Sequence, residues 1–153
     1  MLGLWLLEGF VHTSDSLSAR LKRSSRPPHL ELGRRGEEAA FFYLRRHGYV
    51  VVARDWRSGK VRGDLDLVAW EKDILCFIEV KSRSTRLVAT AESAVDSDKA
   101  QVLRRLARQY MQAMPVTPGR VRFDILSVYF ETRVNFELYR GAFGWHAAER
   151  TRY

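Results

Sequence analysis

The sequence predicts an α/β domain in which a central mixed β-sheet is flanked by helices. The expected element order is α-β-β-β-α-β, with one further, weaker strand at the end. Two observations predict it. Apolar residues recur at helical spacing in residues 32–47 and 96–114. Three short runs typical of strands lie between these two segments, and another run follows the second one.

The first elements can be placed in order along the chain. Residues 32–47 form the first helix, and Gly48 is placed to cap its C-terminus. The β-branched run at residues 49–53 predicts a short strand. A turn at residues 57–60 then leads into a second strand that begins at Asp64.

The later elements follow the same logic. Residues 74–78 form a continuous apolar run, as expected of a strand buried on both faces, which ends at Lys81. The expected elements after it are a loop at 82–95, a helix at 96–114 with Asp96 or Ser97 as its N-cap, a strand at 121–130 and a weaker strand at 134–139.

Length and composition limit the class of protein. A chain of 153 residues, 46% hydrophobic and 29% charged, predicts one soluble domain with one core. The single cysteine, Cys76, cannot form an internal disulfide, so we expect a cytoplasmic protein and a structural thiol. The formal net charge of +8 favours a polyanionic partner such as nucleic acid, with an anionic membrane surface as the rival.

The ends of the chain differ from the centre. The apolar N-terminus is interrupted by Glu8 and is shorter than the ~20 residues that a membrane span requires. A serine-rich stretch that ends at Pro27 and Pro28 follows. We therefore expect a flexible extension at residues 1–29, a domain at 30–145, a tail at 146–153, and neither a membrane span nor a signal peptide.

The most informative stretch is GDLDLVAWEKDILCFIEVK, residues 63–81. Asp64 and Asp66 are two residues apart, so in a strand both leave the same face, and Glu79 and Lys81 do likewise. A carboxylate and an amine at the end of so apolar a strand are costly to bury unless they are paired or bound to a metal. This is the residue set that a metal-dependent phosphodiesterase needs.

Two interpretations of this set remain open. In the first, Asp66 and Glu79 bind Mg²⁺ or Mn²⁺, a hard cation that prefers oxygen ligands, and Lys81 orients the attacking water or stabilises the transition state. In the second, the same residues form a structural ion pair at a sheet edge without a metal. The four histidines are scattered, which argues against a zinc site.

Several short pieces between residues 32 and 143 form a specific set. They are Gly33-x-x-Gly36-Glu37, Ala39-Ala40, Tyr43-Leu44, Gly48-Tyr49, residues 63–69, residues 77–83, Lys99, residues 122–124 and Ala142-Phe143. As a set they resemble the YraN family of bacterial proteins, which is similar in fold to Holliday-junction resolvases of the PD-(D/E)xK nuclease superfamily.

The resemblance implies a restriction-endonuclease-like fold and a set of catalytic residues: Glu37, Asp66, Glu79 and Lys81. It also implies a metal site formed by Asp66 and Glu79 with Asp64. The family pattern usually has Glu in place of Asp64, so Asp66 is the better ligand candidate. An acidic residue such as Glu37 in a first helical turn is also stabilised by the helix dipole whatever its function.

Three functions are compatible with these features. The leading hypothesis is a metal-dependent endonuclease that hydrolyses phosphodiester bonds in DNA, in branched or single-stranded forms, with a homodimer suggested by analogy alone. The alternative is a nucleic-acid-binding module with the same fold and little turnover that acts with a partner. The third is a membrane-surface protein. The expected nucleic-acid-binding residues are Arg34, Arg35, Arg62, Arg83 and Lys99.

Overall fold

The computed structural model describes residues 27–86, 97–115 and 117–146. Several expectations fall outside these ranges: most of the N-terminal extension, most of the loop at 82–95, the Asp96 cap and most of the C-terminal tail. Residues Leu32–Tyr153 form one unit, and the site described below lies within it.

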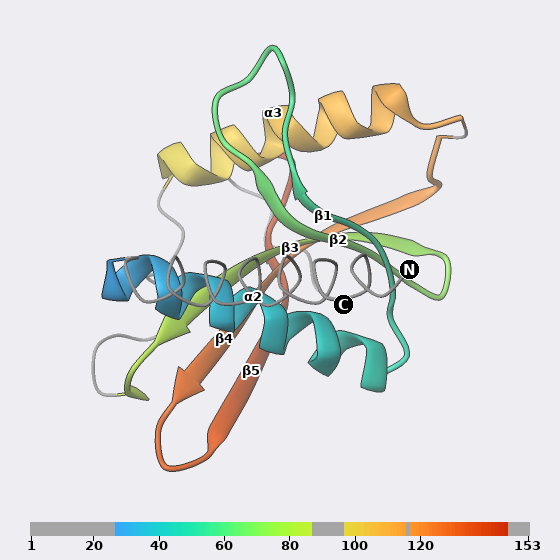
Figure 1. The fold of residues 1–153 in the computed structure, drawn as a ribbon. Coiled ribbons are helices and arrows are strands. Elements are labelled where there is room, and N and C mark those ends of the chain that lie inside the picture. The colour runs from blue at the N-terminus through green and yellow to red at the C-terminus, as the bar shows by residue number, and fades with distance from the viewer. Residues whose placement is uncertain (1–26, 87–96, 116, 147–153) are drawn as a thin grey trace, which may run out of the picture. The chain divides into compact units, whose positions relative to one another are not determined.

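Two helices and five strands make up the described fold (Figure 1). They are α2 (Pro28–Arg46), β1 (Val50–Trp56), β2 (Leu65–Glu71), β3 (Ile74–Arg83), α3 (Ser97–Ala113), β4 (Arg120–Phe130) and β5 (Val134–Phe143). This order, α-β-β-β-α-β-β, confirms the predicted fold class and includes the weaker last strand.

The five strands form one mixed sheet in the order β1-β2-β3-β4-β5. Strands β1, β2 and β3 form an antiparallel meander, and β4 and β5 are also antiparallel. Strands β3 and β4 are parallel, because the chain crosses over through α3 between them. The central strand β3 is therefore hydrogen-bonded on both edges, which explains its continuous apolar run.

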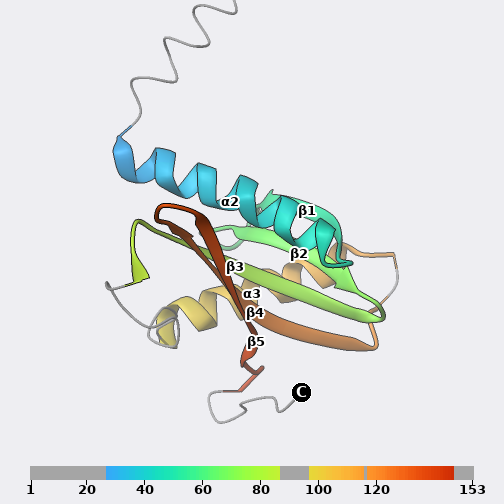
Figure 2. The same ribbon diagram turned by 90° about the horizontal axis from the view of Figure 1, so that it is seen from below.

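The two helices cover opposite faces of the sheet (Figure 2). Leu44 of α2 packs with one set of strand side chains, which includes Leu67 and Cys76. Leu106 of α3 packs with the alternate set, which includes Phe77. Cys76 is a core residue, as expected, and burial raises the pKa of its thiol to about 12.

The tryptophans support the α3 side of the core. Trp56 and Trp70 are partly buried against the hydrophobic cluster under α3. The Trp56 ring meets Tyr110 of α3 edge to face, with ring centroids 5.2 Å apart. In the described part of the chain, no helix combines the length and the hydropathy that a membrane crossing requires.

Helix α2 begins four residues earlier than the periodicity predicts. Pro28 is its first residue, and the Pro27 carbonyl accepts hydrogen bonds from the backbone N–H groups of Leu30 and Glu31. Proline suits a first helical position because its missing N–H would have no partner there. The Pro pair therefore lies at the start of the helix. Because α2 begins at Pro28, Glu37 lies in the middle of the helix and not in its first turn, so the helix dipole does not account for it.

Gly48 ends α2 as predicted. Its φ of 83° lies in the left-handed region, which glycine adopts without steric cost. The Gly48 N–H donates to the Arg45 carbonyl, and the Tyr49 N–H donates to the Leu44 carbonyl. Tyr49 and Leu44 also pack in the same cluster, which completes a Schellman motif and starts β1.

Several strand boundaries differ from the sequence prediction. Strand β3 continues to Arg83, so the first two residues of the predicted loop at 82–95 belong to the strand. Strand β1 continues to Trp56, because pairing with β2 overrides the weak local pattern after residue 53. Strand β2 begins at Leu65, so Asp64 precedes it. Strand β5 continues to Phe143 through an irregularity around Gly141, where φ is 60°, which the alternation in the sequence does not reveal.

Helix α2 touches β3 at one close contact. A Cβ atom added to Gly36 would lie 1.7 Å from Ser82 Oγ and 2.8 Å from Ser82 Cβ. Only glycine permits this approach of helix to strand. The contact fixes the height of α2 over the carboxyl end of β3, and with it the position of the next residue, Glu37.

We predict that Gly36→Ala destabilises the protein by about 1–3 kcal/mol, because the added methyl group overpacks the helix–strand contact. Gly33→Ala is the matched control, since nothing lies within 4 Å of a Cβ at Gly33. That change should stabilise the protein slightly, by up to about 1 kcal/mol. Urea unfolding measures both values. Equal effects of the two substitutions would contradict the close contact.

Candidate functional site

Asp66 and Glu79 lie opposite each other on adjacent strands. The register that pairs Leu67 with Ile78 brings Asp66 of β2 opposite Glu79 of β3 one position further along. Asp66 Oδ2 accepts a 2.7 Å hydrogen bond from the Val80 backbone N–H, which fixes its carboxylate beside β3. The two carboxylates therefore form a cross-strand pair on the same face of the sheet.

Glu79 is the most buried member of the site, with 4% of its surface exposed. Its Oε1 atom lies 2.8 Å from Lys81 Nζ, on the same strand face, and 3.2 Å from Lys99 Nζ of α3. Its Oε2 atom is also buried but has no hydrogen-bond partner among the described residues. An unpaired buried carboxylate oxygen costs about 1–3 kcal/mol or more, so this atom is suited to a ligand.

The environment of Asp66 disfavours a negative charge. Burial, followed by the nearby charge of Glu79, raises the pKa of Asp66 to about 7. The hydrogen bond from Val80 and the charge of Lys99 act in the opposite direction. Asp66 and Glu79 are therefore two carboxyl groups whose negative charges repel each other in a mostly buried position. A bound cation would stabilise this arrangement.

Glu37 joins this group from α2. Burial and the neighbouring Asp55, by charge and by a side-chain hydrogen bond, raise the pKa of Glu37 to about 7, and Asp64 also contributes. Glu37 in turn contributes to the raised pKa of Asp66, so the helix and the sheet are electrostatically coupled. The structure thus brings Asp66, Glu79 and Lys81 together and places Glu37 within electrostatic range of Asp66.

Asp64 lies at the rim and has a different partner. Its Oδ2 atom is 3.2 Å from Arg57 Nη2, and its side chain is 34% exposed. Because β2 begins at Leu65, the expectation that Asp64 and Asp66 share a strand face does not apply. Asp64 still raises the pKa of Lys99, so it lies within electrostatic range of the site.

Lys99 is more than a solvated lysine. It lies in the first turns of α3, and its side chain is 34% exposed. Burial lowers its pKa, but the charges of Glu79 and Asp66 outweigh this effect and hold the pKa of Lys99 above its ordinary value. The ammonium group is therefore firmly charged at neutral pH and faces the two carboxylates.

The other expected nucleic-acid-binding residues lie in separate places. Arg34 pairs with Glu38 on α2 at 3.3 Å, and the Arg35 guanidinium lies 4.8 Å from the centre of the Phe130 ring. Arg62 lines a surface pocket of about 380 Å³ together with Arg57 and Asp64. Arg83 lies two residues after Lys81 on β3, so both side chains leave the same face of the strand. The Arg83 Nε atom is buried and has no hydrogen-bond partner among the described residues.

The donor set fits a hard divalent cation. Within the described ranges, no three His, Cys, Asp or Glu side chains converge as a complete protein cage. Mg²⁺ does not require one, because it keeps several waters and commonly uses one or two carboxylates plus substrate phosphate oxygens. The unpartnered Glu79 Oε2 and the adjacent Asp66 carboxylate provide two such oxygen donors.

The sequence analysis missed Asp55. It lies in β1, and the register on either side of it places it opposite Asp66. Its φ of 47° is unusual for a residue with a side chain. No sequence signal identifies it, because its contact with Glu37 depends on the pairing of β1 with β2 and on the position of α2.

Asp124, which is part of the matching piece at residues 122–124, is paired with an arginine and fully buried. Both of its carboxylate oxygens accept hydrogen bonds from Arg122, at 2.7 and 2.8 Å. Arg122 also contacts Glu71 at 2.7 Å, and Glu71 contacts Arg140 at 2.8 Å. This cluster is balanced in charge.

Comparison with known proteins gives a consistent result. The chain is 52% identical to a UPF0102 protein of Koribacter versatilis over 116 residues, which cover 75% of this chain and 80% of that relative. It is 44% identical over 124 residues to a UPF0102 protein of Solibacter usitatus, with 81% and 92% covered. It is also 44% identical over 103 residues to one from Bacteroides thetaiotaomicron, with 67% and 83% covered.

The model of the family described as "Uncharacterised protein family UPF0102" matches residues 36–128. This range begins at the glycine that touches β3 and includes every carboxylate and lysine of the acidic site. The resemblance to the YraN family is confirmed by these matches. The chain belongs to the uncharacterised protein family UPF0102.

Proposed function

We propose that this protein is a Mg²⁺- or Mn²⁺-dependent endonuclease that hydrolyses phosphodiester bonds in DNA. The observation that carries the proposal is the buried, unpartnered Oε2 atom of Glu79 beside the Asp66 carboxylate, with Lys81 on the same strand face. Buried polar atoms in folded proteins are nearly always satisfied, so an exception of this kind is a reasonable place for a ligand.

Glu79 and Asp66 would hold the cation through oxygen atoms, and Glu37 would position a water or add a ligand from α2. When bound, the metal supplies Lewis-acid polarisation of the phosphoryl oxygen and lowers the pKa of a bound water. The raised pKa of Glu37, about 7, suits a group that accepts a proton at neutral pH.

The two lysines have separable roles in this proposal. Lys81 is on the same strand as Glu79 and fixes the orientation of its carboxylate. Lys99 approaches the same oxygen from α3. Two fixed ammonium groups beside one carboxylate form a compact positive region, which suits the charge that develops on a phosphate during hydrolysis.

The charge of the chain supports DNA as the substrate. The formal net charge is +8, and phosphate contacts by Lys and Arg dominate the affinity of proteins for nucleic acids. Arg83 continues the basic character of β3 beyond Lys81, and Arg62 lies on the loop before β2. The basic groups adjoin the acidic site, which favours a polyanionic substrate over a free metabolite.

We expect Glu79→Gln and Glu37→Gln to lower metal-dependent DNA cleavage by about 10²-fold or more, because each removes a charge that holds the metal or the water. The matched control is Glu38→Gln. It changes the neighbouring exposed carboxylate on the same helix, which pairs with Arg34 and not with the acidic site. Cleavage of labelled branched, single-stranded and duplex DNA in Mg²⁺, Mn²⁺ or EDTA measures the effect.

The pattern of results distinguishes the alternatives. Cleavage that survives in Glu79→Gln protein would show that the activity arises elsewhere and would refute this assignment. Absence of cleavage by the unmodified protein, with DNA still retained in a mobility shift, would favour the nucleic-acid-binding module. The Glu38→Gln protein should match the unmodified protein in either case.

A second prediction concerns stability in EDTA. The folded-state pKa of Asp66 is about 7 and that of Glu37 is about 7, both raised from the ordinary values of these carboxyl groups. Between pH 4 and 7 the folded state therefore binds more protons than the unfolded state, so these groups make stability fall as pH rises. Asp66→Asn should make the decrease of stability with pH smaller, because it removes one of these carboxyl groups, and it should raise Tm at pH 8 in EDTA.

Thermal unfolding with Mn²⁺ completes this test. Mn²⁺ should raise the Tm of the unmodified protein at pH 8, because a ligand that binds only the folded state stabilises it by mass action. Asp66→Asn protein should lose most of this increase although it is more stable in EDTA. A metal-independent Tm in the unmodified protein would contradict the proposed metal site.

A further inference from the structure

One face of α2 leads away from the acidic site along β1. Glu37, Phe41 and Arg45 follow at intervals of four residues and therefore share this face. Arg54 of β1 lowers the pKa of Glu37 through its charge, and its guanidinium lies 4.6 Å from the centre of the Phe41 ring. The Arg45 guanidinium lies 5.5 Å from the same ring. The order along the face is carboxylate, Arg54, Phe41, Arg45.

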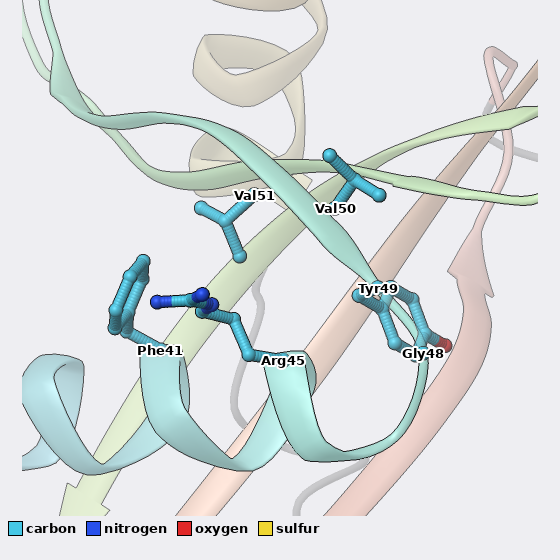
Figure 3. A pocket seen from close by; sticks show the side chains of 6 residues that line it. All are labelled: Phe41, Arg45, Gly48, Tyr49, Val50 and Val51. Atoms are coloured by element: carbon cyan, nitrogen blue, oxygen red, sulfur yellow. The ribbon is translucent and has the colours of Figure 1, made fainter.

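A pocket of about 500 Å³ lies at the far end of this face (Figure 3). The residues that line it are Phe41, Arg45, Gly48, Tyr49, Val50 and Val51. Figure 3 shows the Arg45 side chain extending from α2 toward Phe41, with Val51 projecting from β1 toward the helix. The walls are mainly apolar, and Arg45 is the charged group.

The pocket is open to a ligand because β1 is an edge strand. Val50 is 63% exposed and Val52 is 46% exposed, although both are large apolar residues. Arg45 is exposed and forms no ion pair within the described ranges, in contrast to Arg34, which pairs with Glu38. Its charge is available, and stacking against Phe41 limits its movement.

We infer that this pocket, defined by Phe41, Arg45, Tyr49, Val50 and Val51, binds one unpaired nucleotide of the DNA strand. The inference rests on the proposed function and specifies its substrate class. The base packs between the Arg45 guanidinium and the Val51 side chain, and Arg54 binds a phosphate between the pocket and the acidic site. Bases stack on guanidinium planes as well as on aromatic rings.

The dimensions agree with this placement. Eight residues of α-helix separate Glu37 from Arg45, which is about 12 Å along the axis. A strand bound beside Glu37 would therefore reach the pocket within its next nucleotides. A base that packs against Arg45 in this pocket is turned away from its complement, so we expect the substrate to be single-stranded at this point.

The test measures DNA binding in EDTA, which separates it from cleavage. An oligonucleotide that carries 2-aminopurine, a base analogue whose fluorescence is quenched by stacking, is titrated with the full chain as a single strand and as a duplex. We expect tighter binding and stronger quenching with the single strand. Arg45→Ala should weaken single-strand binding about 10-fold or more and abolish the quenching, since stacking contributes about 1–3 kcal/mol per base.

Arg46→Ala is the matched control. It removes the same charge from the next residue of α2, which lines a different pocket with Phe42 and Phe136. Binding by Arg46→Ala protein should stay within about 2-fold of the unmodified protein, since an exposed charge contributes little. Phe41→Leu, which keeps an apolar side chain but removes the ring beneath both arginines, should reduce the quenching.

Equal weakening by Arg45→Ala and Arg46→Ala, on single strand and duplex alike, would overturn the inference and leave only general charge attraction. Failure of the unmodified protein to bind either DNA in EDTA would also overturn it, whereas metal-dependent cleavage in the separate assay would still support the proposed function. Specific loss in Arg45→Ala protein without any cleavage would support the pocket and refute the endonuclease.

Discussion

The site depends on the burial of one carboxylate, Glu79, at the carboxyl end of the central strand. Strand β3 is hydrogen-bonded on both edges and covered on both faces as far as Glu79, which is the last buried residue of the strand and only 4% exposed. Lys81 and Lys99 hold one of its oxygens, and the other has no described partner. Burying a charge in this way costs stability, which a purely structural role would not require. The proposed ligand recovers that cost.

The cluster around Arg122 shows what a structural solution looks like in the same sheet. Asp124 is fully buried, yet both of its oxygens accept hydrogen bonds from Arg122, and the Gly141 N–H donates a third. Glu71 has an arginine on each oxygen. Every carboxylate oxygen in this cluster is satisfied, and the charges balance. The two clusters contain similar residue types. They differ in whether every carboxylate oxygen has a hydrogen-bond partner, and this difference, not the presence of charge, distinguishes the proposed binding site from a structural ion-pair cluster.

The sequence predicted the features that depend on local pattern. Asp66, Glu79 and Lys81 could be assigned because a period of two places residues on one strand face, and the apolar run before Glu79 revealed its burial. Asp55 could not be found, because its role follows from strand register and from a left-handed backbone. The contact of Lys99 with Glu79 depends on the crossover between β3 and β4, which brings α3 to the end of the sheet.

Helix α2 links these features because it runs past both of them. Gly36 touches Ser82 and places the helix against β3. The next residue, Glu37, lies within electrostatic range of Asp66, and Phe41 and Arg45 follow on the same face toward the β1 pocket. The Schellman motif at Gly48 joins the other end of the helix to β1. A shift at the glycine contact would therefore displace Glu37 and Arg45 together, so the distance between these two residues is set by the helix and not by flexible loops.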